Sequence, residues 1–378
     1  MLRHVQRLLP ALLLGTLLAT GAHGGERIDP ALATRVEGDA TAWYDARLLG
    51  VEGQGWSDTA APYDRLPARA EATVREAVWG LSRHSAGLCV RFVTDATALR
   101  VKWKLTSASL AMPHMPATGV SGVDLYVRHE GTWRWLACGF PTAEANEVAL
   151  FSEIPPGERE YRLYLPLYNG VSEVALGLPA EASLQLPPPY AAGHEKPLVF
   201  YGTSITQGGC ASRPGMVHTA ILGRRFERPV INLGFSGNGR LEPEVAELMA
   251  ELDPAVFIVD CLPNVGAEDV ASRTEPLVTI LRAARPETPI LLVEDRTYSN
   301  AFLIQSSRQR NDSSRQAFRA AYERLSSAGV VGLHYLAGEH LLGEDNEGTV
   351  DSSHPTDLGF VRQADAFEAA LQPILSGE

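Results

Sequence analysis

The chain changes its pattern of hydrophobic and polar residues about halfway along. Up to residue 185, apolar and polar residues alternate over short segments, which is typical of strands that bury one face. Turn residues such as Glu130-Gly131 and Pro155-Pro-Gly157 separate these segments. The expected strands are 88–93, 98–105, 123–128 and 161–165. Short alternating strands at this spacing predict a jelly-roll-like β-sandwich rather than a helical domain.

From Pro197 onward, continuously apolar segments alternate with segments of helical periodicity. The expected strands are 198–201, 230–233, 255–259, 290–293 and 332–335. The expected helices are 243–252, one capped by Thr274 with Pro276 in its first turn, 312–326, and 357–371 capped by Thr356. Strand–helix alternation with strands that are apolar throughout predicts a parallel sheet covered on both faces, a three-layer α/β domain.

These patterns divide the chain into a β-sandwich domain at 25–185, a Pro-rich linker at 186–196 and an α/β domain at 197–378. In the first 24 residues, two arginines precede an apolar run at 8–18, and small residues follow it. The run is too short to span a membrane, so 1–24 is predicted to be a signal peptide of an exported protein, periplasmic or secreted. An uncleaved anchor is the alternative.

The charge of the chain limits its partners. The net charge is −12, and lysine occurs only at Lys102, Lys104 and Lys196. There is no basic run that could follow a phosphate backbone, so nucleic acid is not an expected partner. The same reasoning argues against an anionic membrane surface, and the mature chain is expected to have no membrane span.

The four cysteines, Cys89, Cys138, Cys210 and Cys261, do not have zinc-ligand spacing, and neither a metal nor another cofactor is expected. In an oxidising compartment disulfides can form. We favour a Cys210–Cys261 pair because both residues would follow strands of one parallel sheet. Four buried free thiols are the alternative.

Candidate chemistry is concentrated at the ends of the predicted parallel strands. The strand at 198–201 leads into Gly202-Thr203-Ser204, a small-residue turn that would place a serine hydroxyl at the carboxyl edge of the sheet. Near the C-terminus, Asp351 precedes His354 by three residues, and Pro355 keeps the histidine out of a helix. Ser204, His354 and Asp351 are therefore predicted as nucleophile, base and orienting acid of a serine hydrolase.

Two further strand ends could supply donors to an oxyanion. The glycine-rich loop after 230–233 contains Gly237, whose N–H could point into the site, although a flexible turn would have the same composition. Asn264 follows the strand 255–259 and could donate through its side-chain amide, or it could cap a helix or turn. Arg213 could contact a polar substrate, but a solvated or ion-paired arginine is the simpler interpretation.

Ser204, Gly237, Asn264 and His354, in this order after successive strands, resemble the SGNH (GDSL) hydrolase superfamily over residues 197–378. Gly122-Val-Asp-Leu-Tyr126 resembles the Gly-x-Asp-Leu-Tyr motif of the β-sandwich that precedes the catalytic domain in one branch of that superfamily. The resemblance implies a Ser-His-Asp triad and an oxyanion hole formed by Ser204, Gly237 and Asn264.

The sequence departs from the superfamily pattern at two places. Thr203 replaces the aspartate before the serine, and Val265 replaces the acid after Asn264. Neither residue is a triad member. The α/β-hydrolase fold is disfavoured because Thr206 replaces the last glycine of its Gly-x-Ser-x-Gly turn.

We therefore expect an exported serine esterase that acts on a small-molecule or glycan ester with a short acyl group, most simply O-acetyl. An acyltransferase with the same triad and a non-catalytic glycan-binding protein are the alternatives. The sequence does not indicate the oligomeric state.

Overall fold

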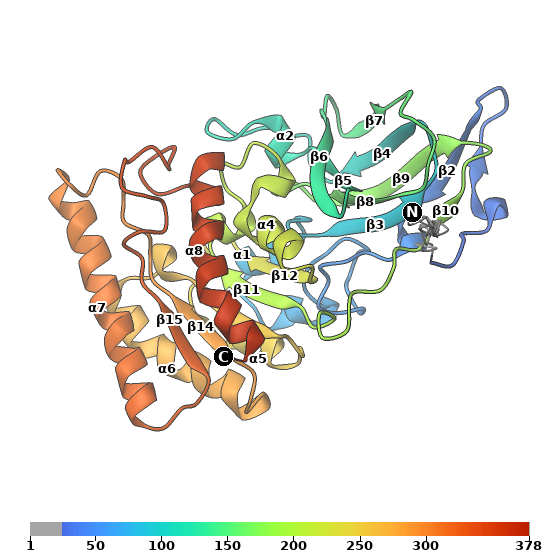
Figure 1. Cartoon of the computed structure of the whole chain (residues 1–378). Coiled ribbons are helices and arrows are strands. Elements are labelled where there is room, and N and C mark those ends of the chain that lie inside the picture. The colour runs from blue at the N-terminus through green and yellow to red at the C-terminus, as the bar shows by residue number, and fades with distance from the viewer. Residues whose placement is uncertain (1–24, 378) are drawn as a thin grey trace, which may run out of the picture.

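The computed structural model describes residues 25–377 and contains an antiparallel β-sandwich and a parallel α/β sheet (Figure 1). The predicted signal peptide at 1–24 lies outside the described residues. One sheet of the sandwich has the order β1 (Thr34–Arg35), β2 (Thr41–Asp45), β9 (Val171–Pro179), β4 (Leu99–Leu105), β7 (Ala145–Phe151). The other has the order β10 (Leu184–Gln185), β3 (Cys89–Thr94), β8 (Arg159–Tyr164), β5 (Val123–His129), β6 (Thr132–Gly139).

The alternating pattern of the first half is confirmed by the packing of these strands. On β4, Leu99, Val101 and Trp103 are buried in the core between the two sheets, whereas Lys102 and Lys104 point outward. This alternation follows from the two-residue repeat of a strand. Trp103 is also fixed by a hydrogen bond from its Nε1 to the Ser121 carbonyl, 2.9 Å, so this tryptophan is a core residue.

The second half forms one five-stranded parallel sheet. Its order is β12 (Val230–Gly234), β11 (Leu198–Gly202), β13 (Val256–Asp260), β14 (Ile290–Val293), β15 (Leu333–Leu336). β12 therefore lies on one side of β11, and the next strand along the chain, β13, lies on the other side. In open α/β sheets, ligands bind at the carboxyl ends of the strands where the order reverses in this way.

Helices cover both faces of this sheet, as the sequence predicts. The α-helices within residues 25–377 are α1 (Glu76–Ser82), α2 (Ala117–Val120), α3 (Ser204–Gln207), α4 (His218–Arg225), α5 (Pro243–Ala250), α6 (Ala267–Ala284), α7 (Gln305–Ser327) and α8 (Asp357–Ser376). Short 3-10 helices are η1 (Pro30–Leu32), η2 (Ala46–Leu49), η3 (Ala68–Ala72), η4 (Pro214–Met216) and η5 (Leu262–Asn264). α4 and α8 pack on one face, and α5, α6 and α7 pack on the other (Figure 1). None of the helices between residues 25 and 377 combines the length and the apolar character needed to cross a membrane.

Two of the predicted helix starts are wrong. α6 begins at Ala267, not after Thr274, and Pro276 lies inside it. Thr274 does not cap the helix, because its hydroxyl donates to the Val270 carbonyl at 2.7 Å, one turn earlier. α7 begins at Gln305 rather than near 312, because its first turns are polar and mostly exposed and therefore carry no hydrophobic periodicity. The start of α8 is confirmed, with Thr356 accepting from the Gly359 N–H.

The packing also crosses the predicted domain division. Residues 56–81, which precede β3 in the sandwich, pack into the same core as the parallel sheet through Trp56, Leu66, Val74 and Val78. The guanidinium of Arg65 is buried there and donates to the carbonyls of Asn232 and Gly234, at 3.0 and 2.7 Å. The region assigned to the sandwich therefore also forms part of the α/β core and supports the loop after β12.

Candidate active site

Ser204 lies at the carboxyl end of β11, beside the point where the strand order reverses. The strand ends at Gly202, and Thr203 caps the short helix α3, with its hydroxyl accepting from the Ile205 N–H at 3.2 Å. Gly202 is required at this turn, since a Cβ there would lie 2.0 Å from the hydroxyl of Thr206. The tight turn therefore fixes Ser204 at the first position of the helix, where its N–H has no acceptor within the helix.

The structure brings together the three residues that the sequence predicts as a triad. The Ser204 hydroxyl lies 2.7 Å from Nε2 of His354, although 150 residues separate them. Nδ1 of His354 lies 2.8 Å from Oδ2 of Asp351. Ser204 is 8% exposed, whereas the side chains of His354 and Asp351 are 25% and 46% exposed. A hydroxyl, an imidazole and a carboxylate in this arrangement can transfer a proton from the serine to the histidine.

The loop that holds His354 is fixed by hydrogen bonds from its backbone N–H groups to the side chain of Asp351. Oδ1 of Asp351 accepts from the N–H groups of Ser353 and His354, at 3.1 and 2.8 Å, so the carboxylate closes a tight turn. Burial acts to raise the pKa of Asp351, but the hydrogen bonds from the His354 backbone and side chain outweigh it and hold the pKa below its ordinary value. Asp351 therefore stays ionised and orients the imidazole.

The loop after β12 and the turn after β13 meet next to Ser204. Gly237 has φ +67°, and a Cβ at this position would meet nothing within 4 Å, so the space beside its Cα is open. No backbone carbonyl among residues 25–377 accepts from the Gly237 N–H. Asn264 ends η5, and its amide nitrogen lies 3.5 Å from the Phe235 carbonyl in the glycine-rich loop. Asn264 does not cap α6, whose N-cap is Gly266.

Arg310 holds the Asn264 turn, a role that the sequence did not indicate. Its guanidinium donates to the carbonyls of Leu262, Pro263 and Val265, at 3.3, 3.2 and 2.6 Å. These hydrogen bonds give three carbonyls of the turn a donor and hold the backbone around Asn264 in place. The residue comes from α7, whose polar first turns gave no signal, so only the tertiary structure could show this contact.

One wall of the site comes from the sandwich side of the molecule. The Tyr168 hydroxyl donates to the Ser204 carbonyl at 3.1 Å, and burial raises the pKa of this phenol. The Gln207 amide lies 3.1 Å from Nδ1 of His84, and its oxygen accepts from the Ser236 N–H at 2.9 Å. The His114 ring has its centroid 6.1 Å from that of His354. These polar residues were not predicted, since nothing local in the sequence relates them to Ser204.

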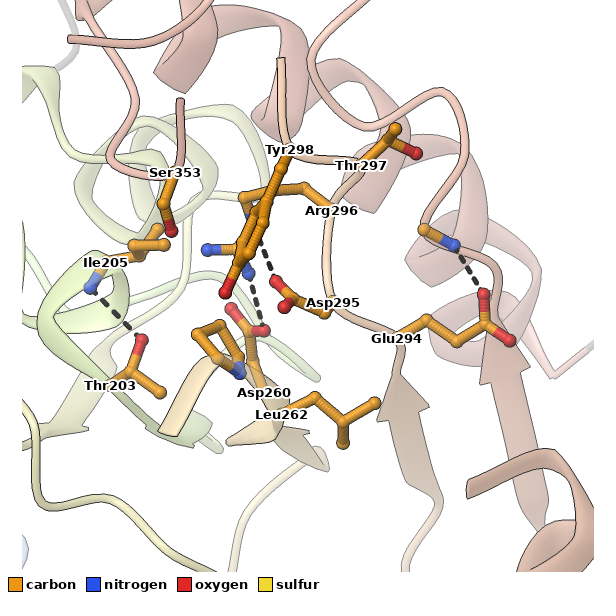
Figure 2. A network of polar contacts seen from close by, with 12 residues as sticks. Thr203, Ile205, Asp260, Leu262, Glu294, Asp295, Arg296, Thr297, Tyr298 and Ser353 are labelled. Carbon is orange, nitrogen blue, oxygen red and sulfur yellow. Dashed lines mark hydrogen bonds and ion pairs between the residues drawn. The ribbon is translucent and has the colours of Figure 1, made fainter. Parts of the chain in front are cut away.

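A buried charge cluster lies at the ends of β13 and β14, near the Ser353 loop (Figure 2). Nη2 of Arg296 donates to Oδ1 of Asp260 at 2.9 Å, and its Nε lies 3.9 Å from Asp295. Oδ2 of Asp260 is 3.5 Å from the hydroxyl of Thr206 on α3. Arg296 therefore forms buried ion pairs with both carboxylates.

Protonation within this cluster makes the free energy of unfolding depend on pH. Burial raises the pKa of Asp260 to about 6, with Arg296 opposing and Asp295 reinforcing the shift. The folded protein therefore binds this proton more tightly than the unfolded chain between about pH 4 and pH 6, and the stabilisation is lost as the pH rises through that window. We expect Asp260→Asn to flatten the fall of the melting temperature between pH 4 and pH 6. Melting temperatures that change equally with pH in the variant and the wild type over this range would contradict the assignment of this pH dependence to Asp260.

The structure corrects one prediction about residues near the site and decides between two interpretations of another residue. Cys210 and Cys261 are free thiols, as are the other two cysteines. Cys261 lies in the core beneath the sheet with its sulfur 3.5 Å from the Tyr201 carbonyl, while Cys210 lies in the loop after α3 on the Asp351 side. For Arg213 the simpler interpretation is confirmed, because its guanidinium forms an ion pair with Asp124 of the sandwich, 2.8 Å. Among residues 25–377, no group of three or more His, Cys, Asp or Glu side chains could hold a metal ion.

Comparison with known proteins agrees with this architecture. Residues 195–372 match the GDSL-like lipase/acylhydrolase family, and residues 41–184 match the Gly-x-Asp-Leu-Tyr N-terminal domain of SGNH-hydrolase-type esterases. A crystal structure from Bacteroides ovatus, described as a GDSL-like lipase, is 32% identical with a TM-score of 0.84, over 89% of this chain and 98% of that one. The protein therefore belongs to the GDSL-like lipase/acylhydrolase family and is an esterase of the SGNH type.

Two more distant structures share the fold. The salicylyl-acyltransferase SsfX3 from a tetracycline biosynthetic pathway is 20% identical, with a TM-score of 0.71 over 90% of this chain and 98% of that one. The acetyl xylan esterase Est2A from the rumen bacterium Butyrivibrio proteoclasticus is 14% identical, with a TM-score of 0.51 over 77% and 90% of the two chains. Among curated proteins, none matches the sequence.

Proposed function

We propose that this esterase hydrolyses short-chain esters of carbohydrates, most simply O-acetyl groups, with Ser204, His354 and Asp351 as its catalytic triad. The observation that carries the proposal is the continuous contact from the Ser204 hydroxyl through His354 to Asp351, at 2.7 and 2.8 Å. The first contact falls within the range over which a base can take a proton from a hydroxyl, and the second lets the carboxylate orient the imidazole.

The reaction follows from these contacts in two steps. As the Ser204 oxygen attacks the ester carbonyl, its proton moves to Nε2 of His354, and the alcohol then leaves with that proton as the ester C–O bond breaks. Water then attacks the acyl-serine carbonyl as His354 takes one of its protons. The bond between the acyl carbon and the Ser204 oxygen breaks, His354 returns the proton to that oxygen, and the carboxylic acid leaves. Asp351 stabilises the imidazolium in both steps.

The oxyanion of each tetrahedral intermediate would be stabilised by the N–H groups of Ser204 and Gly237 and by the Asn264 amide. Within residues 25–377 the first two N–H groups have no acceptor, because one lies at a helix start and the other in the glycine-rich loop. Preorganised donors of this kind stabilise the charge that develops in the transition state.

The carbohydrate assignment is supported by the polar side chains of His114 and Tyr168 beside the triad, since a sugar alcohol needs hydrogen-bonding groups around it. It is also supported by the fold shared with the acetyl xylan esterase. Export through the segment 1–24 fits a polymeric substrate outside the cell, and N-terminal sequencing of the mature protein would test it.

Acyl transfer is the second candidate, because the salicylyl-acyltransferase has the same fold. A transferase must keep water from the acyl-enzyme. Here the His354 and Asp351 side chains are 25% and 46% exposed, so water can approach the base. Hydrolysis is therefore the better match to the site, and an assembled triad would have no purpose in a protein that only binds glycans.

The test is hydrolysis of p-nitrophenyl acetate, butyrate and octanoate, together with acetate release from acetylated xylo-oligosaccharides. We expect acetate to be the preferred acyl group and the glycan to be deacetylated. A fluorophosphonate should label Ser204, which peptide mass spectrometry would identify. Preference for octanoate would contradict the substrate assignment, and labelling elsewhere would contradict the triad. Product formation that requires an added acceptor alcohol would favour the transferase.

A further inference from the structure

The Gly-x-Asp-Leu-Tyr motif lies on β5, and its side chains point to two different places. Val123 and Leu125 are fully buried in the core of the sandwich. Because side chains alternate along a strand, Asp124 and Tyr126 point the other way, toward the α/β part of the molecule. Gly122 is needed before them, since a Cβ there would lie 2.5 Å from the Thr118 carbonyl. Only half of the motif therefore serves the sandwich itself.

Asp124 is fully buried and has three donors around it. Its Oδ2 accepts from Nη1 of Arg213 and from the N–H of Gly215, both at 2.8 Å, and Oδ1 accepts from Nε1 of Trp135 at 2.9 Å. Burial raises the pKa of Asp124, while Arg213 acts in the opposite direction. A buried carboxylate with this many donors is strongly held in place, because losing any one donor would leave it poorly compensated.

Tyr126 contacts the same two residues of the α/β part. Its hydroxyl accepts from Nη1 of Arg213 at 2.7 Å and donates to the Gly215 carbonyl at 3.3 Å. A Cβ on Gly215 would lie 2.3 Å from the Tyr126 ring and 2.7 Å from the Asp124 carboxylate, so the contact requires glycine. Asp124, Tyr126, Arg213 and Gly215 together are called the clamp below.

The clamp lies at one end of the segment 208–216, and the other end contacts Ser204. The N–H groups of Gly208 and Gly209 donate to the Ser204 carbonyl, at 2.9 and 2.7 Å. Gly209 also lies against the base, since a Cβ there would be 3.2 Å from Cδ2 of His354. The segment therefore runs from the sandwich to both reacting side chains.

The middle of the same segment fixes the start of α8, where the histidine loop ends. The Ser212 N–H donates to Oδ1 of Asp357 at 2.9 Å, and its hydroxyl donates to Oδ2 at 2.5 Å. Asp357 follows His354 by three residues. From the sandwich side, the Thr118 hydroxyl donates to the Ser212 carbonyl at 2.6 Å. One short segment thus connects the sandwich, the nucleophile and the loop of the base.

We propose that the Gly-x-Asp-Leu-Tyr motif positions the catalytic residues: Asp124 and Tyr126, through Arg213 and Gly215, hold segment 208–216 so that Ser204 and His354 remain within hydrogen-bonding distance. The sandwich then contributes to catalysis by holding the active-site residues in position, and it is not only an appended domain. Neither residue touches the substrate, so both are positioning residues. This inference rests on the proposed triad, whose geometry it explains.

The test compares Asp124→Asn and Tyr126→Phe with Glu227→Gln in the full mature chain. Asparagine keeps the shape of Asp124 but removes the charge that faces Arg213, and phenylalanine keeps the packed ring of Tyr126. Glu227 is a matched control, because it pairs across the same domain boundary with Arg128, on the same strand as Asp124, but does not touch segment 208–216. Turnover of p-nitrophenyl acetate is divided by the number of sites that a fluorophosphonate titrates, so misfolded molecules do not count.

We expect Asp124→Asn to lower kcat per titrated site at least tenfold with KM changed less than threefold, and the rate of phosphonylation to fall in parallel. Tyr126→Phe should lower kcat about threefold, and Glu227→Gln should stay within twofold of wild type. If Asp124→Asn does not fold, the Tyr126→Phe result decides.

Full kcat per titrated site in both clamp variants, or an equal loss in Glu227→Gln, would overturn the proposal. Absence of turnover and of Ser204 labelling in the wild type would instead overturn the proposed function, so the two failures can be told apart.

Discussion

Replacing Ser204 with alanine is expected to lower kcat/KM for p-nitrophenyl acetate by about 10⁵-fold or more, the loss typical of removing the nucleophile of a triad. The hydroxyl lies 2.7 Å from Nε2 of His354, and no other described hydroxyl is hydrogen-bonded to that nitrogen among residues 25–377. Alanine removes the attacking atom and leaves the binding surface and the oxyanion donors in place. The residual rate should be that of binding and oxyanion stabilisation alone.

The measurement is initial-rate hydrolysis with protein purified away from host esterases. Ser272→Ala is a suitable control, because Ser272 lies on the exposed side of α6 and its hydroxyl only donates to carbonyls of its own helix. That variant should match wild type. Activity of Ser204→Ala within a few-fold of wild type would mean that another residue, or an activated water, performs the attack.

Replacing Asp351 with asparagine is expected to lower kcat by roughly 10³- to 10⁴-fold while leaving the fold intact. The asparagine oxygen can still accept from the N–H groups of Ser353 and His354, so the turn persists. Its amide would face Nδ1 of His354, which must then accept and carry no proton. The proton of the neutral imidazole moves to Nε2, and this nitrogen can then no longer accept the proton of the Ser204 hydroxyl. The loss therefore comes from the wrong tautomer and not from a displaced loop.

Asp345→Asn is the matched control for this variant. Asp345 lies in the same segment before α8, its side chain is 49% exposed against 46% for Asp351, and it pairs with Arg362 instead of a histidine. It should keep wild-type kcat. Because the pKa of Asp351 lies below its ordinary value, protonation of this carboxylate should not limit activity near neutral pH. Equal kcat for Asp351→Asn and Asp345→Asn would exclude Asp351 as the orienting acid.

The elements with a strong local signal could be predicted from the sequence. β14 has the predicted bounds, β11 and β12 extend one residue further than predicted, and β13 and β15 are shifted by one residue. These strands were predictable because a buried strand is apolar at every position. The start of α8 was predictable for a different local reason, since a threonine side chain can satisfy the first N–H groups of a helix. α7 was shortened in the prediction because polar turns on a protein surface have no hydrophobic repeat.

The site could be predicted as a set of residues but not as an arrangement. Ser204, Gly237, Asn264 and His354 each follow a strand or precede a helix, and parallel strands bring such positions to one edge of the sheet. The walls of the site were not predictable: His114, Tyr168 and Arg310 are ordinary residues in their own segments. The predicted Cys210–Cys261 disulfide was wrong for a related reason. Two residues that follow strands of one sheet lie near the same edge, but their side chains can lie on different sides of the sheet.

The sequence by itself determined the two kinds of architecture, the order of the strands along the chain, and the residues with the chemistry for ester hydrolysis, because hydrophobic periodicity and turn composition are local properties. Only the tertiary structure decided the spatial strand order, the packing of residues 56–81 into the α/β core, and the use of Arg213 in the domain contact. These depend on which buried polar group finds a partner far away in the chain. Asp124 and Arg213 are 89 residues apart, and only folding shows that each neutralises the other.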